Sequence, residues 1–293
     1  MAPEGTYVLT HVGFSREEKP ILSLRRQETD VSFNPIGNTF TLSFDTSQRA
    51  CIGWHDITAG QSFACPDSVA TNAQYEQCAS CQKRTGFNPA FYNATTVSPQ
   101  QEQRNLEPHI LYLAHFAPGV VKVGISHAAR DRGRLLEQGA RSALILDVFP
   151  TAHIARQYEA KIAAIPGIAE TIQVKRKLEL LKQPYTNHDA QRELIETRTR
   201  IETLLKTSFS PNTPMTLEEQ YFPAAAPSLS EAIDITDKQV ISGQGIGMLG
   251  SLLFCAQEDL PTFVALKKFI GYAVTVSHTQ TSIDLPVRQM TLF

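Results

Sequence analysis

The chain has 293 residues, of which 42% are hydrophobic and 19% are charged, and its formal net charge is −2 at pH 7. This composition is typical of a globular protein and excludes a fibrous repeat or a chain that is disordered throughout. The apolar runs are too short to span a bilayer, and the N-terminus lacks a basic region ahead of an apolar one. We therefore expect a cytoplasmic protein without a membrane segment.

The charge is unevenly distributed along the chain. Residues 1–99 carry 7 Lys and Arg against 9 Asp and Glu, residues 100–206 carry 16 against 12, and residues 207–293 carry 4 against 8. A basic centre between acidic flanks indicates a modular protein whose middle part binds an anionic partner. Ordinary solvated helix surfaces are the alternative explanation.

The first fifty residues are predicted to form strands, because β-branched and aromatic residues concentrate in three runs separated by turn-forming sequence. These runs are Thr6–Val12, Pro20–Arg25 and Thr39–Phe44. The next segment, residues 51–92, is irregular, polar and cysteine-bearing. Residues 93–108 have almost no apolar content and are predicted to be a linker.

Four of the five cysteines lie in one short stretch, at Cys51, Cys65, Cys78 and Cys81. The last two form a C-x-x-C knuckle, the spacing at which two thiolates bind one ion in a tight turn, and the first two complete a tetrahedral shell. We predict a structural Zn²⁺ in a four-cysteine, zinc-ribbon-like element over residues 51–92. His55 is an alternative to Cys51 as a ligand. Four unrelated reduced cysteines, or a redox C-x-x-C, are the other interpretations.

Basic and aromatic residues follow the knuckle. Lys83 and Arg84 precede Phe87, Phe91 and Tyr92. Such interleaving can neutralise phosphates and stack bases, so we assign Lys83 and Arg84 to nucleic-acid binding. The alternative is that the aromatic rings pack over the small metal-bound core.

The composition changes at residue 109, where predicted strands and helices begin to alternate. The strands are His109–Phe116, Val120–Ser126 and Ser142–Phe149. The helices are Ala128–Gln138, ended by Gly139, then Thr151–Ile165 with Thr151 as N-cap, and Asp189–Lys206.

The C-terminal third returns to strands after a segment with four prolines, Ser208–Pro227, which is predicted to be a loop. The expected strands are Gln239–Ser242, Ser251–Ala256, Thr262–Ala265 and Tyr272–Ser277. The G-x-G-x-x-G run from Gly245 to Gly250 is followed by a strand-like sequence, so we interpret it as a glycine-rich β-turn and not as a dinucleotide fingerprint.

These elements predict an α+β fold in which both β-rich ends join one sheet. The expected parts are a β segment over residues 1–50, the cysteine element over 51–92, a small α/β domain over 109–206, and a β-rich segment over 229–293.

The strongest functional signal lies in the central domain. Tyr112 and Gly124 fall in two strands of a predicted hairpin, with several arginines, among them Arg130 and Arg134, downstream and Glu159 in the next helix. This set of groups is suited to the cleavage of phosphodiesters. A phenol and a cation can act on a water molecule, an arginine can bind the phosphate, and one carboxylate can hold a divalent metal.

The central domain resembles the GIY-YIG endonuclease superfamily over about residues 109–190. Leu111-Tyr112-Leu113 matches the first motif, and the segment Lys122 to Ser126 (KVGIS) matches a lysine-glycine form of the second. The resemblance implies that Arg134 is the catalytic arginine and that Glu159 binds the catalytic metal. Asn187 lies where some members have an asparagine that closes the site.

Two positions depart from the family pattern. Val123 stands where we expect the second signature tyrosine, and Gln138 stands where many members have a histidine. These losses leave Tyr112 or His127 as the general base. The whole chain, with its Gln-Cys-x-x-Cys knuckle, also resembles an uncharacterised bacterial family that is known only as a domain of unknown function.

We therefore expect a metal-dependent endonuclease that acts on DNA or RNA. Lys122, Gly124, Arg134 and Tyr112 would form the catalytic site, Glu159 would hold Mg²⁺ or Mn²⁺, and Arg130 would contact nucleic acid. The alternatives are a non-catalytic nucleic-acid-binding protein that keeps the fold and the zinc, and a zinc-bound scaffold for protein interactions.

Overall fold

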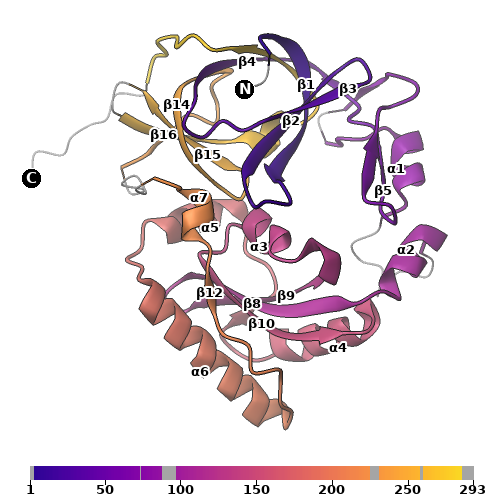
Figure 1. Ribbon diagram of the computed structural model, residues 1–293, viewed down its shortest axis with the longest axis vertical. Helices are drawn as coiled ribbons and strands as arrows, with labels where there is room; N and C mark the ends of the chain where they lie inside the picture. Colours follow the sequence, from indigo (N-terminus) through magenta and orange to yellow (C-terminus); the bar gives the residue numbers. More distant parts are fainter. Residues whose placement is uncertain (1–2, 73, 88–96, 225–230, 258–259, 286–293) are drawn as a thin grey trace, which may run out of the picture.

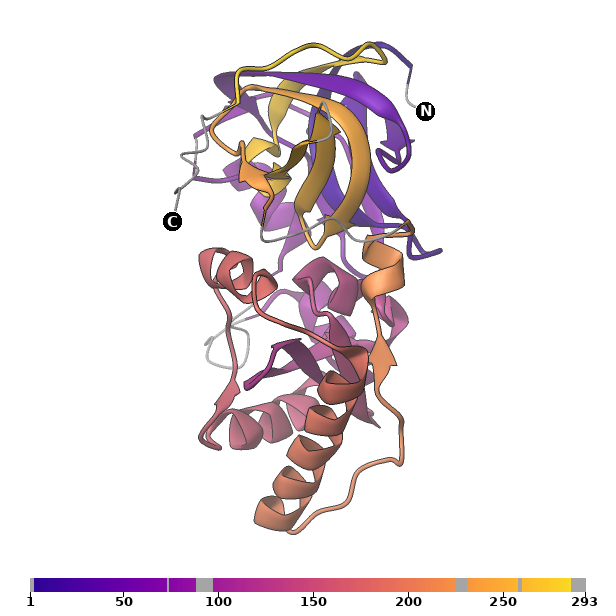
Figure 2. The same ribbon diagram turned by 90° about the vertical axis from the view of Figure 1, so that its left-hand side faces the viewer.

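The computed structural model describes residues 3–72, 74–87, 97–224, 231–257 and 260–285. Two lobes lie one above the other (Figure 1). The upper lobe is formed by both ends of the chain and the lower lobe by its middle, and the side view shows the same division (Figure 2). No described helix is long and apolar enough to cross a membrane.

The upper lobe is built on one sheet that contains ten of the described strands. Its N-terminal strands are β1 (Gly5–Phe14), β2 (Pro20–Arg26), β3 (Thr29–Phe33), β4 (Thr39–Ala50) and β7 (Ala70–Thr71). Its C-terminal strands are β13 (Ile233–Asp234), β14 (Val240–Leu249), β15 (Leu252–Gln257), β16 (Leu260–Ala265) and β17 (Tyr272–Ser277). Strand β4 pairs with both β14 and β17, which confirms that the two β-rich ends share one sheet.

The lower lobe contains a five-stranded sheet in the order β11-β9-β8-β10-β12. Its strands are β8 (His109–Ala117), β9 (Val120–His127), β10 (Ser142–Phe149), β11 (Ile168–Ala169) and β12 (Met215–Thr216). Its main helices are α3 (Gly133–Gln138), α4 (Ala152–Ala163), α5 (Val174–Leu181) and α6 (Asn187–Leu205). The apolar side chains of α4 and α6 cover one face of this sheet, and α3 and α5 cover the other face, which is directed toward the upper lobe.

Several elements follow from local sequence as expected. The Thr151 side chain accepts a hydrogen bond from the Ile154 N–H at 3.4 Å and caps α4. Gly139 ends α3 in the left-handed conformation, with φ of 71°. Gly250 lies in the turn between β14 and β15, and no helix follows it, as the β-turn interpretation requires. Gly245 and Gly247, however, lie within β14.

Other elements differ from the prediction. The expected helix Ala128–Gln138 is split into a 3₁₀ turn, Ala128–Arg130, and α3, because Asp131 takes a positive φ of 41° between them. The expected linker contains α2 (Pro99–Asn105), whose N-cap Ser98 accepts a hydrogen bond from the Gln101 N–H at 3.1 Å. Its sequence is polar throughout, so it shows no apolar periodicity that would predict a helix. The Ser-Pro pair is nevertheless typical of the start of a helix. The proline-rich loop contains β12 and α7 (Glu218–Tyr221).

The two lobes share one hydrophobic core. Leu135 and Leu136 of α3 and Leu180 of α5 are buried together with Leu249, Leu252 and Phe254 of the upper lobe. Tyr221 of α7 is completely buried, and its hydroxyl donates to the Ala140 carbonyl at 2.7 Å. The lobes are therefore held by the same kind of packing that holds the interior of each lobe.

Gly247 makes this junction possible, because a Cβ atom there would lie 2.1 Å from Phe222 Cδ1 and 2.6 Å from the Tyr221 carbonyl oxygen. We predict that Gly247→Ala lowers the free energy of unfolding by about 1–3 kcal/mol, since overpacking forces the neighbouring backbone to shift. Gly133→Ala is the matched control, because a Cβ atom there meets nothing within 4 Å. Denaturant unfolding measures both variants, and equal midpoints would contradict this account of the junction.

Candidate metal centre and active site

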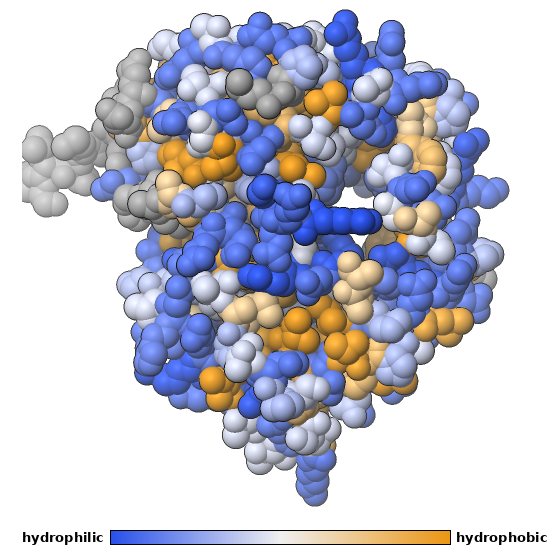
Figure 3. Space-filling model, in the orientation of Figure 1, coloured by the Kyte–Doolittle hydropathy of each residue, from blue (hydrophilic) through white to orange (hydrophobic). Residues whose placement is uncertain are grey.

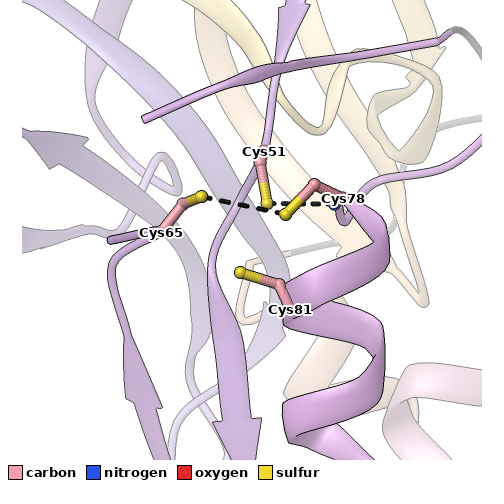
Figure 4. Close-up of side chains that lie close together, drawn as sticks. All are labelled: Cys51, Cys65, Cys78 and Cys81. Carbon is pink, nitrogen blue, oxygen red and sulfur yellow. Dashed lines mark hydrogen bonds between the residues drawn. The ribbon is translucent and has the colours of Figure 1, made fainter. Parts of the chain in front are cut away.

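The four predicted cysteines converge beside the upper lobe. Their sulfur atoms all lie within 4.8 Å of one another, and their side chains point toward a common centre (Figure 4). Cys51 follows β4, Cys65 follows the small hairpin of β5 (Trp54–Asp56) and β6 (Gln61–Phe63), and Cys78 and Cys81 lie at the start of α1 (Ala79–Thr85). Segments that are well separated in the sequence are thus brought to one point.

The surroundings suit thiolate ligands. The Cys51 sulfur accepts hydrogen bonds from the Cys78 N–H at 3.1 Å and the Gly53 N–H at 3.4 Å, which stabilise a negative sulfur. All five cysteines of the chain are free. Four sulfurs at this spacing could hold a metal ion such as zinc.

His55 is not part of this group. Its Nδ1 lies 2.8 Å from the Ser62 hydroxyl oxygen across the β5–β6 hairpin. Burial lowers the pKa of the His55 imidazole. The set with metal-binding geometry is therefore the four cysteines without His55.

The basic residues of the knuckle lie at the end of α1. Lys83 and Arg84 are exposed in its last turn, and Phe87 follows them with 58% of its surface accessible. Phe91 and Tyr92 lie outside the described residues.

The first motif of the central domain forms a close contact between two strands. Tyr112 of β8 lies opposite Gly124 of β9. A Cβ atom at position 124 would be 2.5 Å from the Tyr112 hydroxyl oxygen, so only glycine leaves room for the phenol. Burial raises the pKa of Tyr112 to about 12, although the Arg134 guanidinium beside it acts in the opposite direction. The phenol therefore stays protonated at neutral pH.

Val123 points to the other face of β9. It is completely buried in the core beneath α4 and α6. Because side chains alternate along a strand, the residue that shares the face of Gly124 and Tyr112 is Lys122. Val123 is therefore a core residue, and its difference from the family pattern does not change the site.

Glu159 is buried although it carries an ionisable group. Only 6% of its surface is accessible, and burial raises the pKa of its carboxyl group, while the neighbouring Arg156 and Lys122 lower it. The Arg156 guanidinium pairs with both Glu159 and Glu170, the latter at 2.7 Å. A cation thus already lies between two carboxylates at this position.

A cavity of about 470 Å³, which we call the glutamate cavity, lies beside Glu159 and Arg156. It is bordered by α2, the end of β9, α3 and α4, and its charged lining residues are Arg104, Arg130, Arg134, Arg156, Glu159 and Glu170. Figure 3 shows hydrophilic side chains gathered around a hollow at the junction of the two lobes. Of the predicted site residues, Arg130, Arg134 and Glu159 line this cavity, and Tyr112 lies buried beside Arg134.

Gln138 and His127 have supporting roles. With its amide oriented to accept, the Gln138 side-chain oxygen receives hydrogen bonds from Arg134 Nε at 3.1 Å and Nη2 at 2.9 Å. His127 Nδ1 accepts from the Ala129 N–H, and its Nε2–H donates to the Glu107 carboxylate. Both ring nitrogens of His127 are therefore occupied, so it does not offer a proton acceptor to the cavity.

Sequence reasoning did not find Arg156, Glu170 or the positioning role of Gln138. A weak signal existed for Arg156, because it precedes Glu159 by three residues and so lies on the same side of a helix. Glu170 lies after β11, a two-residue strand that the sequence pattern does not reveal.

The model of one protein family matches most of the chain. This family is described as "Protein of unknown function (DUF2797)", and the match covers residues 37–274. No curated protein and no solved structure matches the chain. The match spans the cysteine cluster, the lower lobe and most of the ten-stranded sheet.

We predict that the double substitution Cys78→Ser and Cys81→Ser releases one bound metal ion per chain and lowers the stability of the N-terminal part, since metal binding is coupled to folding. Elemental analysis of protein purified without chelators measures the metal content. Cys255→Ala is the control, because this cysteine is buried in β15, away from the cluster. Wild-type protein without any transition metal would contradict the assignment.

Proposed function

The chain belongs to the DUF2797 family, and we propose that it is a metal-dependent endonuclease that cleaves phosphodiester bonds in DNA or RNA. Its partner is then nucleic acid, and residues 109–206 form a GIY-YIG-like domain. The cysteine cluster holds a structural Zn²⁺, since four thiolates select zinc and leave no coordination position for water.

One observation carries this proposal. Lys122, Arg134 and Glu159 come from three different elements and meet in a partly buried site. Lys122 and Glu159 each favour the charged form of the other, whereas Arg134 lowers the pKa of Lys122. Tyr112 adds a phenol beside the same arginine. Convergence of ionisable groups whose pKa values are shifted by burial is typical of catalytic sites.

Glu159 would hold Mg²⁺ or Mn²⁺ in this account. The fit rests on the position of Arg156, because a site that holds a guanidinium between Glu159 and Glu170 already favours a cation. Mg²⁺ needs only one or two protein carboxylates and takes its other ligands from water and phosphate. When bound, the ion supplies Lewis-acid stabilisation of the developing charge.

The residues of the chain position the phosphate. Arg134, held by Gln138, offers a guanidinium that can bind two phosphate oxygens, and Lys122 adds a second positive charge. Since Tyr112 has a pKa of about 12 and is buried beside Arg134, its phenol does not deprotonate the attacking water and instead helps to position the guanidinium.

A non-catalytic nucleic-acid-binding protein is the second candidate. The observation that favours it is the ion pair between Arg156 and Glu159, which neutralises the carboxylate that the enzyme requires. The two functions differ in whether cleavage accompanies binding. A scaffold for protein interactions, the third possibility, predicts no binding of nucleic acid even at low salt.

Glu159→Gln separates the first two functions. We predict that cleavage in Mg²⁺ falls roughly a hundredfold or more, because the charge that attracts the ion is gone. Binding should persist or tighten, because one negative charge near the phosphate is removed. Cleavage rates and binding isotherms at fixed salt measure the two effects.

Glu196→Gln is the control, since this glutamate of α6 is exposed and does not line the glutamate cavity. Equal cleavage by wild type and Glu159→Gln would remove Glu159 from the site. Absence of cleavage in both, with binding intact, would favour the non-catalytic function.

A further inference from the structure

A second cavity of about 310 Å³ lies between the lobes, and we call it the lysine cavity. It shares Arg134, Glu170 and Thr171 with the glutamate cavity, so the two cavities lie next to each other, and we call the pair the groove. Its walls come from both lobes, because Lys122 and Lys177 belong to the lower lobe and Lys267 to the upper lobe. Lys177 belongs to a basic run, residues 175–177, for which the sequence alone favours solvated surface over contact with phosphate, and Lys267 was not expected to belong to a site.

The lysine cavity has an excess of positive charge. Three lysines and Arg134 face two carboxylates, Glu137 and Glu170. Both carboxylates already pair with arginines, Glu137 with Arg130 and Arg134, and Glu170 with Arg156. Among the described residues, none of the three lysines has a carboxylate partner within ion-pair distance. The lysine charges are therefore available to an anion.

The positive charges around Lys177 lie close enough together to repel one another. Lys177 Nζ donates to the Gln138 carbonyl at 2.7 Å, which fixes the ammonium at the wall of the cavity. Burial lowers the pKa of Lys177 to about 8, and the nearby Lys122, Arg134 and Lys267 contribute to this lowering. Mutual repulsion of this kind disfavours the empty site, and a phosphate would relieve it.

We propose that the lysine cavity binds the phosphate next to the scissile one, so that the substrate is a single strand of nucleic acid that lies in the groove between the lobes. This inference rests on the proposed function, because it takes the glutamate cavity as the place of cleavage. Adjacent phosphates of one strand belong to neighbouring nucleotides, which matches two cavities that meet at Arg134.

The size of the groove favours a single strand. Each cavity is of the order expected for one drug-sized ligand, the scale of one nucleotide. The shared core fixes the lobes on either side, so the groove does not widen without loss of packing. A duplex would bring a second backbone that has no cavity of its own.

Binding of labelled single-stranded DNA and RNA oligonucleotides, without a divalent metal, tests the inference. For Lys177→Gln and Lys267→Gln together, we predict roughly tenfold weaker binding at moderate salt, because a charged hydrogen-bond partner of the phosphate is lost. In a plot of log affinity against log salt concentration, the slope should become less steep by about 0.7, the value for one phosphate contact with a single strand. Wild type should bind a duplex of the same sequence more weakly than either single strand.

The matched control is Lys268→Gln. Lys268 is the neighbour of Lys267, but its ammonium pairs with Asp237 at 2.7 Å outside the cavity, so its loss should leave binding unchanged. Each single lysine variant is also measured, and thermal unfolding checks that all variants are folded. Lys267 is exposed, so its replacement leaves the core intact.

The outcomes separate the two proposals. Unchanged binding and salt slope in the double variant, or equal affinity for duplex and single strand, would overturn the lysine-cavity inference even if the protein cleaves. Weaker binding in the double variant, in a wild type that binds single strands but never cleaves, would support a phosphate site in the lysine cavity and contradict the endonuclease function. A wild type that binds no oligonucleotide overturns both.

Discussion

The apolar contact between α3 and the β14–β15 hairpin is the constraint on which the rest of the structure depends. Leu135 and Leu136 on one side and Leu249 and Leu252 on the other are almost completely buried. Helix α3 also carries Arg134, so the packing that joins the lobes fixes the arginine where the two cavities meet. Since packed cores resist deformation, the groove between the lobes is set in place before any ligand enters.

The same packing explains why charge accumulates at the junction. Apolar side chains occupy the centre of the interface, and the ionisable residues are displaced to its edge, where both lobes contribute them. Partial burial then shifts the pKa values of Lys122, Lys177 and Glu159 in the direction that disfavours their charged forms. The arginines pair with the carboxylates, whereas the lysines remain without carboxylate partners among the described residues. The positive charges of these lysines therefore favour the binding of an anion in the groove.

Local sequence patterns predicted the elements whose signals are strong and short in range. The apolar run of β8, the Thr151 cap of α4 and the cysteine spacing each depend on residues close in the chain, and each appears as expected. The polar helix α2 and the break at Asp131 were not predicted, because helix propensity and apolar periodicity carry little information at these positions. The sequence did not predict the lysine cavity. Lys177 and Lys267 are far apart in the sequence, and they meet only because the C-terminal strands return to the sheet that the N-terminal strands began.

The central claim is that the groove holds a phosphodiester for cleavage. The most direct measurement is a cleavage screen with the full-length wild-type protein over single-stranded, duplex and branched DNA and RNA, each with Mg²⁺, Mn²⁺ or a chelator. The account predicts strand scission that requires the divalent metal and is fastest at single-stranded segments. Folded, metal-loaded protein that leaves every one of these substrates intact would contradict it.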